Sequence, residues 1–114
     1  ELIKSNWPDA FRTARMVPAV EYIQASRLRT TLIQEMHKTM QDFDLFITPS
    51  FRHLILGNLT GHPLICIPDG FNKNGLPSSI GFFGKLYGES EIMSVAKHFQ
   101  DNTDHHLQHP PDFT

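Results

Sequence analysis

The most regular hydrophobic pattern in the chain lies between Pro18 and Phe43. Apolar side chains recur there at steps of three or four residues, close to the 3.6-residue repeat of an α-helix. The repeating positions are Tyr22, Ala25, Leu28, Leu32, Met36, Met40 and Phe43. Proline is favoured at the start of a helix, and the intervening side chains are polar. The pattern predicts one long amphipathic helix over residues 19–42, which must pack against a partner surface.

Three short apolar runs follow, each of a length typical of a β-strand. Residues 44–48 end at Pro49, residues 64–67 lie between two prolines, and residues 80–83 form the third run. Runs that are apolar on both faces are typical of strands covered from both sides. Glycine and asparagine are concentrated in residues 69–75, which favours a turn. The second and third runs are therefore predicted to form a hairpin with a long loop.

The rest of the chain predicts a second helix and two irregular ends. Apolar residues between Ile92 and Phe99 have helical spacing, and acidic residues before them complement the helix dipole, which predicts a helix ending near Asp101. Residues 1–17 show no sustained period and are expected to be an irregular lead-in with one helical turn. The domain is expected over residues 18–111, with an extended surface segment from residue 105. Residues 112–114 are a tail.

Composition limits the classes of function. The chain has 114 residues, enough for one domain or part of a larger one. Ten Lys and Arg against twelve Asp and Glu give a net charge of -2. This charge does not favour binding to nucleic acid or to an anionic membrane. No apolar run approaches the roughly 18 residues of a membrane span. The chain shows no targeting segment and begins at Glu1, so we expect a cytoplasmic protein and a piece of a longer polypeptide.

Several residues with reactive side chains are better explained without a site. The histidines between His98 and His109 lie in a proline-rich segment that provides no scaffold for a metal, so no metal and no cofactor is predicted. Ser50 and His53 lack the glycine-flanked turn of a nucleophile elbow. The single cysteine, Cys66, excludes an internal disulfide and, between two isoleucines, is expected to be a buried apolar side chain.

The stretch from Leu56 to Pro63 combines two glycines, a proline and polar side chains at the entrance of a buried strand. Sites of α/β proteins commonly gather at such places. The alternative is a conformational device that only caps the strand, and composition alone favours this alternative.

Six motifs of the chain, taken together and in order, resemble the C-terminal part of amidase-signature enzymes. The motifs are Tyr22 and Ala25 with Arg27 and Arg29, Asp44–Pro49, Asn58–Pro63, Ile67–Phe71, Gly75–Pro77 and Gly84–Glu89. The family includes bacterial amidases and the A subunit of glutamyl-tRNA amidotransferase. The resemblance implies an α/β fold: the C-terminal portion of a mixed sheet with helices on both sides, made of a long helix, three short buried strands and a short C-terminal helix.

The resemblance also implies an activity and its limits. Family members are hydrolases that cleave carboxamide C–N bonds with a lysine and two serines, and no residue of this chain matches any of the three. The catalytic part would precede Glu1, and this segment alone is predicted to be inactive. Amidotransferase A subunits have a longer segment with an acidic residue where this chain has only Ser50–Gly57, and Ser78–Gly81 replaces the usual Val-Gly-Leu-Gln.

These departures favour a general bacterial-type amidase. The alternatives are a non-catalytic interaction module and the A subunit of an amidotransferase. By the same resemblance, the connection from Phe51 to Thr60 is expected to line the substrate pocket. Its candidate residues are Phe51, His53, Leu54, Leu56, Asn58 and Thr60. The expected partners are a small-molecule amide and the remainder of the amidase domain, together with a second copy of the chain in a homo-oligomer.

Overall fold

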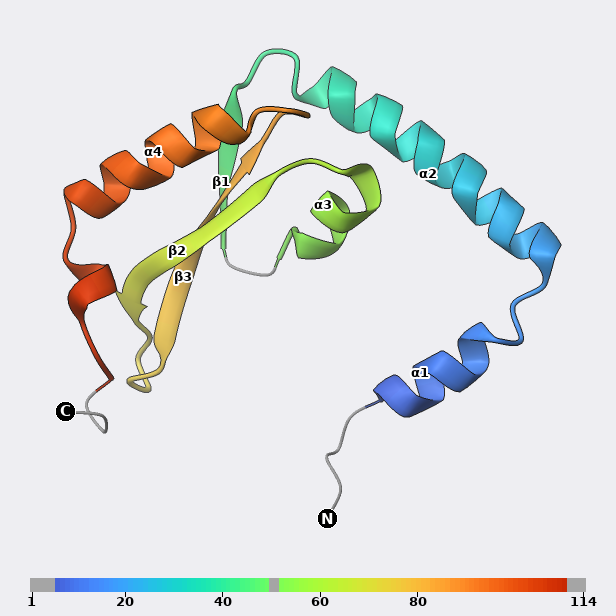
Figure 1. Ribbon diagram of the computed structural model, residues 1–114, viewed down its shortest axis with the longest axis horizontal. Helices are drawn as coiled ribbons and strands as arrows, with labels where there is room; N and C mark the ends of the chain where they lie inside the picture. The colour runs from blue at the N-terminus through green and yellow to red at the C-terminus, as the bar shows by residue number, and fades with distance from the viewer. Residues whose placement is uncertain (1–5, 50–51, 111–114) are drawn as a thin grey trace. The chain divides into compact units, whose positions relative to one another are not determined.

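The computed structural model of the chain describes residues 6–49 and 52–110 (Figure 1). Its helices are α1 (Trp7–Ala14), α2 (Ala19–Thr39), α3 (Leu54–Thr60) and α4 (Glu89–Asp101), followed by a 3-10 turn, η1 (His105–Leu107). Its strands are β1 (Leu45–Pro49), β2 (Leu64–Phe71) and β3 (Pro77–Gly84). The chain divides into two compact units, Glu1–Thr31 and Leu32–Thr114, and each is described by itself.

The first unit contains α1 and most of α2. The expectation of an irregular lead-in was wrong for residues 7–14, which form two turns of helix. Pro8 lies in the first turn, where a missing N–H costs little, and Arg12 pairs with Asp9 at 3.0 Å. The rings of Trp7 and Phe11 stack one turn apart at 5.7 Å. The helix was missed because two turns are too short to show a sustained apolar period.

The long helix predicted from the apolar stripe is confirmed as α2, which ends at Thr39, three residues earlier than expected. The stripe has two different environments. Met36 and Met40 are buried in the second unit, whereas Tyr22 and Leu28 are exposed in the first unit. Only the C-terminal end of the stripe therefore packs into the core that the structure describes.

The three predicted strands form one antiparallel sheet in the order β1-β3-β2. β2 and β3 form the predicted hairpin, with Ile65 opposite Phe82, and β1 pairs with the other side of β3, with Phe46 opposite Phe83. Successive side chains of a strand point to opposite faces. Phe82 and Phe83 therefore mark the two faces of the sheet, and each belongs to its own apolar cluster.

The first cluster lies between the sheet and α4, where Ile67 and Phe82 pack with Ile92 and Ala96 of the helix. The second cluster lies on the opposite face, where Phe83 packs with Met36 and Met40. Three partly buried side chains complete the second cluster: Phe46, Leu56 and Leu64. The α/β class expected from the sequence is confirmed, with helical cover on both faces of the sheet.

The hairpin connection is shorter than predicted, because β2 extends into the glycine-rich segment as far as Phe71 and β3 begins earlier than expected, at Pro77. The side-chain oxygen of Asn72 accepts hydrogen bonds from the backbone N–H groups of Asn74 and Leu76, at 2.8 and 3.1 Å. Gly75 adopts a left-handed φ of 75° there, which glycine allows without strain. A register shift between Pro68 and Gly70 places Asp69 in a bulge, where its carboxylate accepts a 2.5 Å hydrogen bond from Ser78.

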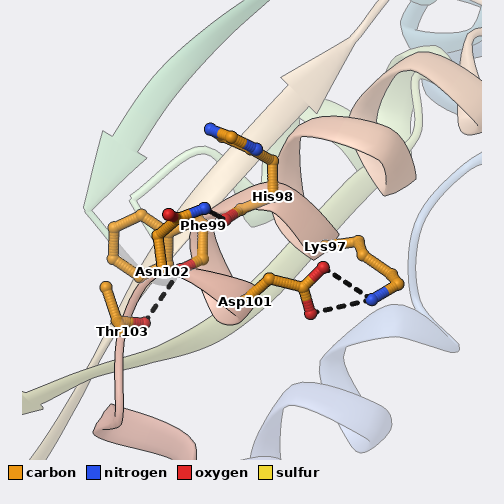
Figure 2. A network of polar contacts seen from close by, with 6 residues as sticks. All are labelled: Lys97, His98, Phe99, Asp101, Asn102 and Thr103. Atoms are coloured by element: carbon orange, nitrogen blue, oxygen red, sulfur yellow. Dashed lines mark hydrogen bonds and ion pairs between the residues drawn. The ribbon is translucent and has the colours of Figure 1, made fainter.

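Helix α4 matches its predicted bounds and closes with side-chain interactions at its C-terminal end (Figure 2). The amide of Asn102 donates to the carbonyl of His98 at 2.8 Å, and the hydroxyl of Thr103 donates to the carbonyl of Phe99 at 2.9 Å. These side chains add donors to carbonyls of the last turn, where the regular helical N–H donors run out. The carbonyl of Phe99 also accepts the backbone N–H of Asn102, at 3.2 Å. Lys97 adds an ion pair with Asp101 at 2.7 Å, four residues further along.

Two further expectations are corrected. The segment after residue 105 begins with the turn η1, and His105 lies 6.2 Å from Phe99, ring to ring, instead of continuing as an extended chain. Cys66 is exposed. Its side chain points to the face of β2 that Ile65 and Ile67 do not share, and on that face the described residues do not cover the thiol. Within residues 6–49 and 52–110, no helix is both long enough and apolar enough to cross a membrane.

Candidate functional site

The connection predicted to line the substrate pocket is a short helix, not a loop. Residues 54–60 form α3, which ends where Gly61 adopts a left-handed φ of 78° and donates its N–H to the carbonyl of Gly57. A side chain at Gly57 would lie 3.3 Å from the carbonyl oxygen of His62 and 3.4 Å from the ring of Phe83. The two glycines therefore terminate α3 and let it approach the sheet closely.

Helix α3 divides the predicted site residues into two groups. Leu56 and Thr60, one turn apart, face the sheet, and Leu56 packs against the cluster of Met36, Met40 and Phe83. Leu54 and Asn58 are exposed, so Asn58 is not a buried hydrogen-bonding side chain. His53 is half-buried directly before the helix. Phe51 lies outside the described residues.

His53 is held by strand β1. Its Nδ1 and the hydroxyl of Thr48 form a short hydrogen bond, and Thr48 is 2% exposed. The imidazole also meets the ring of Phe46 edge-on, at 5.4 Å between centroids. A histidine whose ring is fixed on two sides is positioned, but its partner here is a hydroxyl and not the carboxylate of a Ser-His-Asp triad.

A second threonine–histidine pair lies at the other end of α3. The hydroxyl of Thr60 donates to the carbonyl of Leu56 at 2.7 Å and lies 2.8 Å from Nδ1 of His62. Thr60 and His62 are 3% and 5% exposed, and the imidazole stacks on Phe83 at 5.5 Å. Burial lowers the pKa of His62 below the ordinary value of 6.5, and the nearby His37 lowers it further.

His62 also lines a pocket of about 390 Å³ in the second unit. The other lining residues come from the end of α2 and from the connection after β3: His37, Met40, Gln41, Lys85, Leu86 and Tyr87. Lys85 keeps an ion pair with Asp44 at 3.1 Å. This volume lies in the range of about 300–1,000 Å³ that holds small molecules.

The described residues contain no group of three or more His, Cys, Asp or Glu side chains placed to hold a metal ion. The described residues include the histidines of the C-terminal segment, as far as His109. The candidate site is built from imidazoles, hydroxyls and apolar side chains, together with Gln41 and Lys85 at the pocket.

Thr48 and His62 were not singled out as site residues from the sequence. Thr48 lies in an apolar strand run, and His62 lies between Gly61 and Pro63 at the end of the Asn58–Pro63 motif. A usable signal for His62 was the pattern Thr-Gly-His, in which a glycine turn brings two polar side chains close together. Neither burial nor pairing was visible in the pattern, because both depend on Phe83 and on the strands that lie next to α3.

Comparison with known proteins supports the resemblance seen in the motifs. Curated relatives that match most of the chain include A subunits of glutamyl-tRNA(Gln) amidotransferase. The protein of Desulforudis audaxviator (strain MP104C) is 30% identical over 80% of this chain. Those of Streptococcus pneumoniae (strain Hungary19A-6) and Streptococcus agalactiae serotype III (strain NEM316) are both 34% identical, over 78% and 81% of it. A scan against models of protein families finds no match.

These similarities support the class that the motifs suggested, a C-terminal amidase-signature-like segment. The particular proteins that it is similar to are amidotransferase A subunits. The chain spans only 22–23% of their length, so most of such a protein has no counterpart in these 114 residues.

Proposed function

We propose that this chain is the C-terminal segment of an enzyme that hydrolyses carboxamide C–N bonds, with the catalytic lysine and serines in a part of the polypeptide upstream of Glu1. The observation that carries this proposal is the similarity of about four fifths of the chain to less than a quarter of each amidase-signature relative. A segment of that proportion is expected to complete a larger domain.

The chemistry of the described residues supports a non-catalytic role for the segment itself. Lys85 and Lys97 are held in ion pairs with Asp44 and Asp101, and Ser78 is bound to Asp69. Neither lysine is paired with a serine, and the partner of Ser78 is a carboxylate instead of the lysine and second serine that the family uses. A nucleophile and its base act only as a unit, so these pairs cannot begin acyl transfer.

The segment instead contributes structure beside a pocket. The sheet, with helices on both faces, holds α3 in place, and α3 carries Leu56 and Thr60 on the side that faces the sheet. None of the described residues that were predicted to line the substrate pocket lines the 390 Å³ pocket itself, but Thr60 contacts His62, which does. We propose that the region of His53, Leu56 and Thr60 forms a wall of the substrate pocket, with the exposed Leu54 and Asn58 on the outer side of α3. Cytoplasmic location and a homo-oligomeric state belong to the same proposal.

One alternative has an observation in its favour. The curated relatives named above are amidotransferase A subunits, which suggests that the full polypeptide acts as one component of such an assembly. Against this, residues 50–57 are short and carry no acidic side chain. We therefore prefer a general amidase that acts without partner proteins.

The test is ammonia release from simple carboxamides, aryl amides included, by the full-length polypeptide purified without other proteins. The proposal predicts turnover under these conditions. The alternative predicts turnover only after the other amidotransferase components and the charged tRNA are added. If neither condition gives turnover, the amidase assignment fails.

A further inference from the structure

The hydrogen bonds of Thr60 determine which nitrogen of His62 carries the proton. A threonine hydroxyl has one hydrogen to donate, and that of Thr60 is directed to the carbonyl of Leu56 at 2.7 Å. The same oxygen must therefore accept at its 2.8 Å contact with Nδ1 of His62. Nδ1 is the donor, so in a neutral imidazole Nε2 is left with a free lone pair.

Burial makes this arrangement specific. His62 is 5% exposed and stacked on Phe83, so its ring is fixed in orientation. Nε2 of His62 is not among the buried side-chain atoms of the described residues that lack a hydrogen-bond partner. Nε2 therefore keeps solvent contact, and His62 lines the 390 Å³ pocket.

The pocket provides complementary groups around that acceptor. Met40 and Leu86 give it apolar walls. Gln41 and Lys85 bring N–H donors to the same pocket, and the Lys85 ammonium has three donors, one of which is used by Asp44. One acceptor, several donors and an apolar wall match a small uncharged molecule that has both an N–H group and a carbonyl.

We propose that this pocket binds a small primary carboxamide, whose amide N–H donates to Nε2 of His62 while its carbonyl oxygen accepts from Lys85 or Gln41. His62 is the binding residue, and Thr60 is a positioning residue that fixes its tautomer. The choice of a carboxamide as the ligand rests on the proposed function, whereas the acceptor at Nε2 rests on the hydrogen bonds alone.

The charge state of the pocket sets a pH limit on binding. The titratable and charged groups that face the imidazole are His37 from α2, and Lys85 and Tyr87 from the connection after β3. Because burial and His37 lower the pKa of His62, the imidazole remains neutral at pH 7. Protonation at lower pH removes the acceptor, so carboxamide affinity should be constant near neutral pH and fall in acid.

The test combines imidazole ¹⁵N NMR with titration of the 114-residue chain by benzamide. At pH 7, His62 should show a protonated Nδ1 and an unprotonated Nε2. Thr60→Val should reverse or mix this tautomer and weaken benzamide binding about three- to tenfold, the size of one neutral hydrogen bond. N,N-dimethylbenzamide, which has no N–H, should bind more weakly than benzamide and should be insensitive to the same change.

Two further variants separate binding from folding. Thr103→Val is the matched control, because its hydroxyl also donates to a carbonyl four residues earlier and it lies outside the pocket lining. It should leave both the tautomer and benzamide affinity unchanged. His62→Phe keeps a ring to stack on Phe83 and should abolish the preference for benzamide over the dimethyl compound.

An Nε2-protonated His62 in the unmodified chain would overturn the inference. So would benzamide binding that is absent or unaffected by Thr60→Val and His62→Phe. Because none of these readouts is turnover, the inference can fail while the full-length polypeptide still hydrolyses amides, and it can hold when no hydrolysis is found.

Discussion

The packing on the face of the sheet beneath α3 depends on Phe83. It is completely buried, packs with Met36 and Met40, and stacks on Phe46 at 4.7 Å and on His62 at 5.5 Å. Phe83→Ala removes the ring from this cluster and leaves a cavity between rigid neighbours. Such replacements cost about 3–5 kcal/mol of unfolding free energy, and the two ring contacts favour the upper end. A domain of this size has only about 5–15 kcal/mol in total.

The assay is urea unfolding of the 114-residue chain followed by far-UV circular dichroism, at two protein concentrations so that self-association is detected. With m near 1–3 kcal/mol/M, the midpoint of Phe83→Ala should fall by more than about 1 M. Ile55→Ala is the control on the outer side of α3, where the side chain is 72% exposed, and should change stability by less than about 0.5 kcal/mol. Equal losses for the two variants would refute the assignment of Phe83 to the core.

Three further predictions concern single positions. Gly84→Ala should cost about 1–3 kcal/mol in the same urea assay, because its Cβ would lie 2.7 Å from Cγ2 of Ile92; an unchanged midpoint would contradict the tight approach of α4 to β3. Asn58→Ala should change stability by less than about 0.5 kcal/mol, since the side chain is exposed, and a loss above about 1 kcal/mol would show that it has a buried partner. The third prediction is that stability falls as the pH drops below about 6.5. The lowered pKa of His62 in the folded state means that the unfolded chain takes up this proton first. His62→Phe should flatten the difference between urea midpoints at pH 7.5 and pH 5, and an equal pH dependence in both proteins would rule out His62 as its source.

The elements with long or repeated apolar patterns were predictable. The spacing of Met36 and Met40 within its stripe indicated α2, and the spacing of Ile92 and Phe99 indicated α4. The apolar run at Leu45–Pro49 indicated β1. In each of these elements, apolar side chains that make the pattern also pack in the two clusters beside the sheet. Local sequence and packing therefore agree.

The missed features depend on contacts between segments that are distant in sequence. Gly57 and Gly61 favoured a loop, yet one permits close packing against Phe83 and the other caps α3. Cys66 lies in an apolar run, but its exposure is set by which elements cover its face of the sheet. The Thr60–His62 pair likewise requires the end of α3 and the start of β2 to meet beside Phe83.

We propose that this segment completes an amidase without containing its catalytic machinery. The most direct measurement compares the full-length polypeptide with the 114-residue chain in one assay of ammonia release from an aryl carboxamide, at equal molar concentrations. We expect turnover by the full-length polypeptide and none above background by the chain alone. Turnover by the purified 114-residue chain would contradict it.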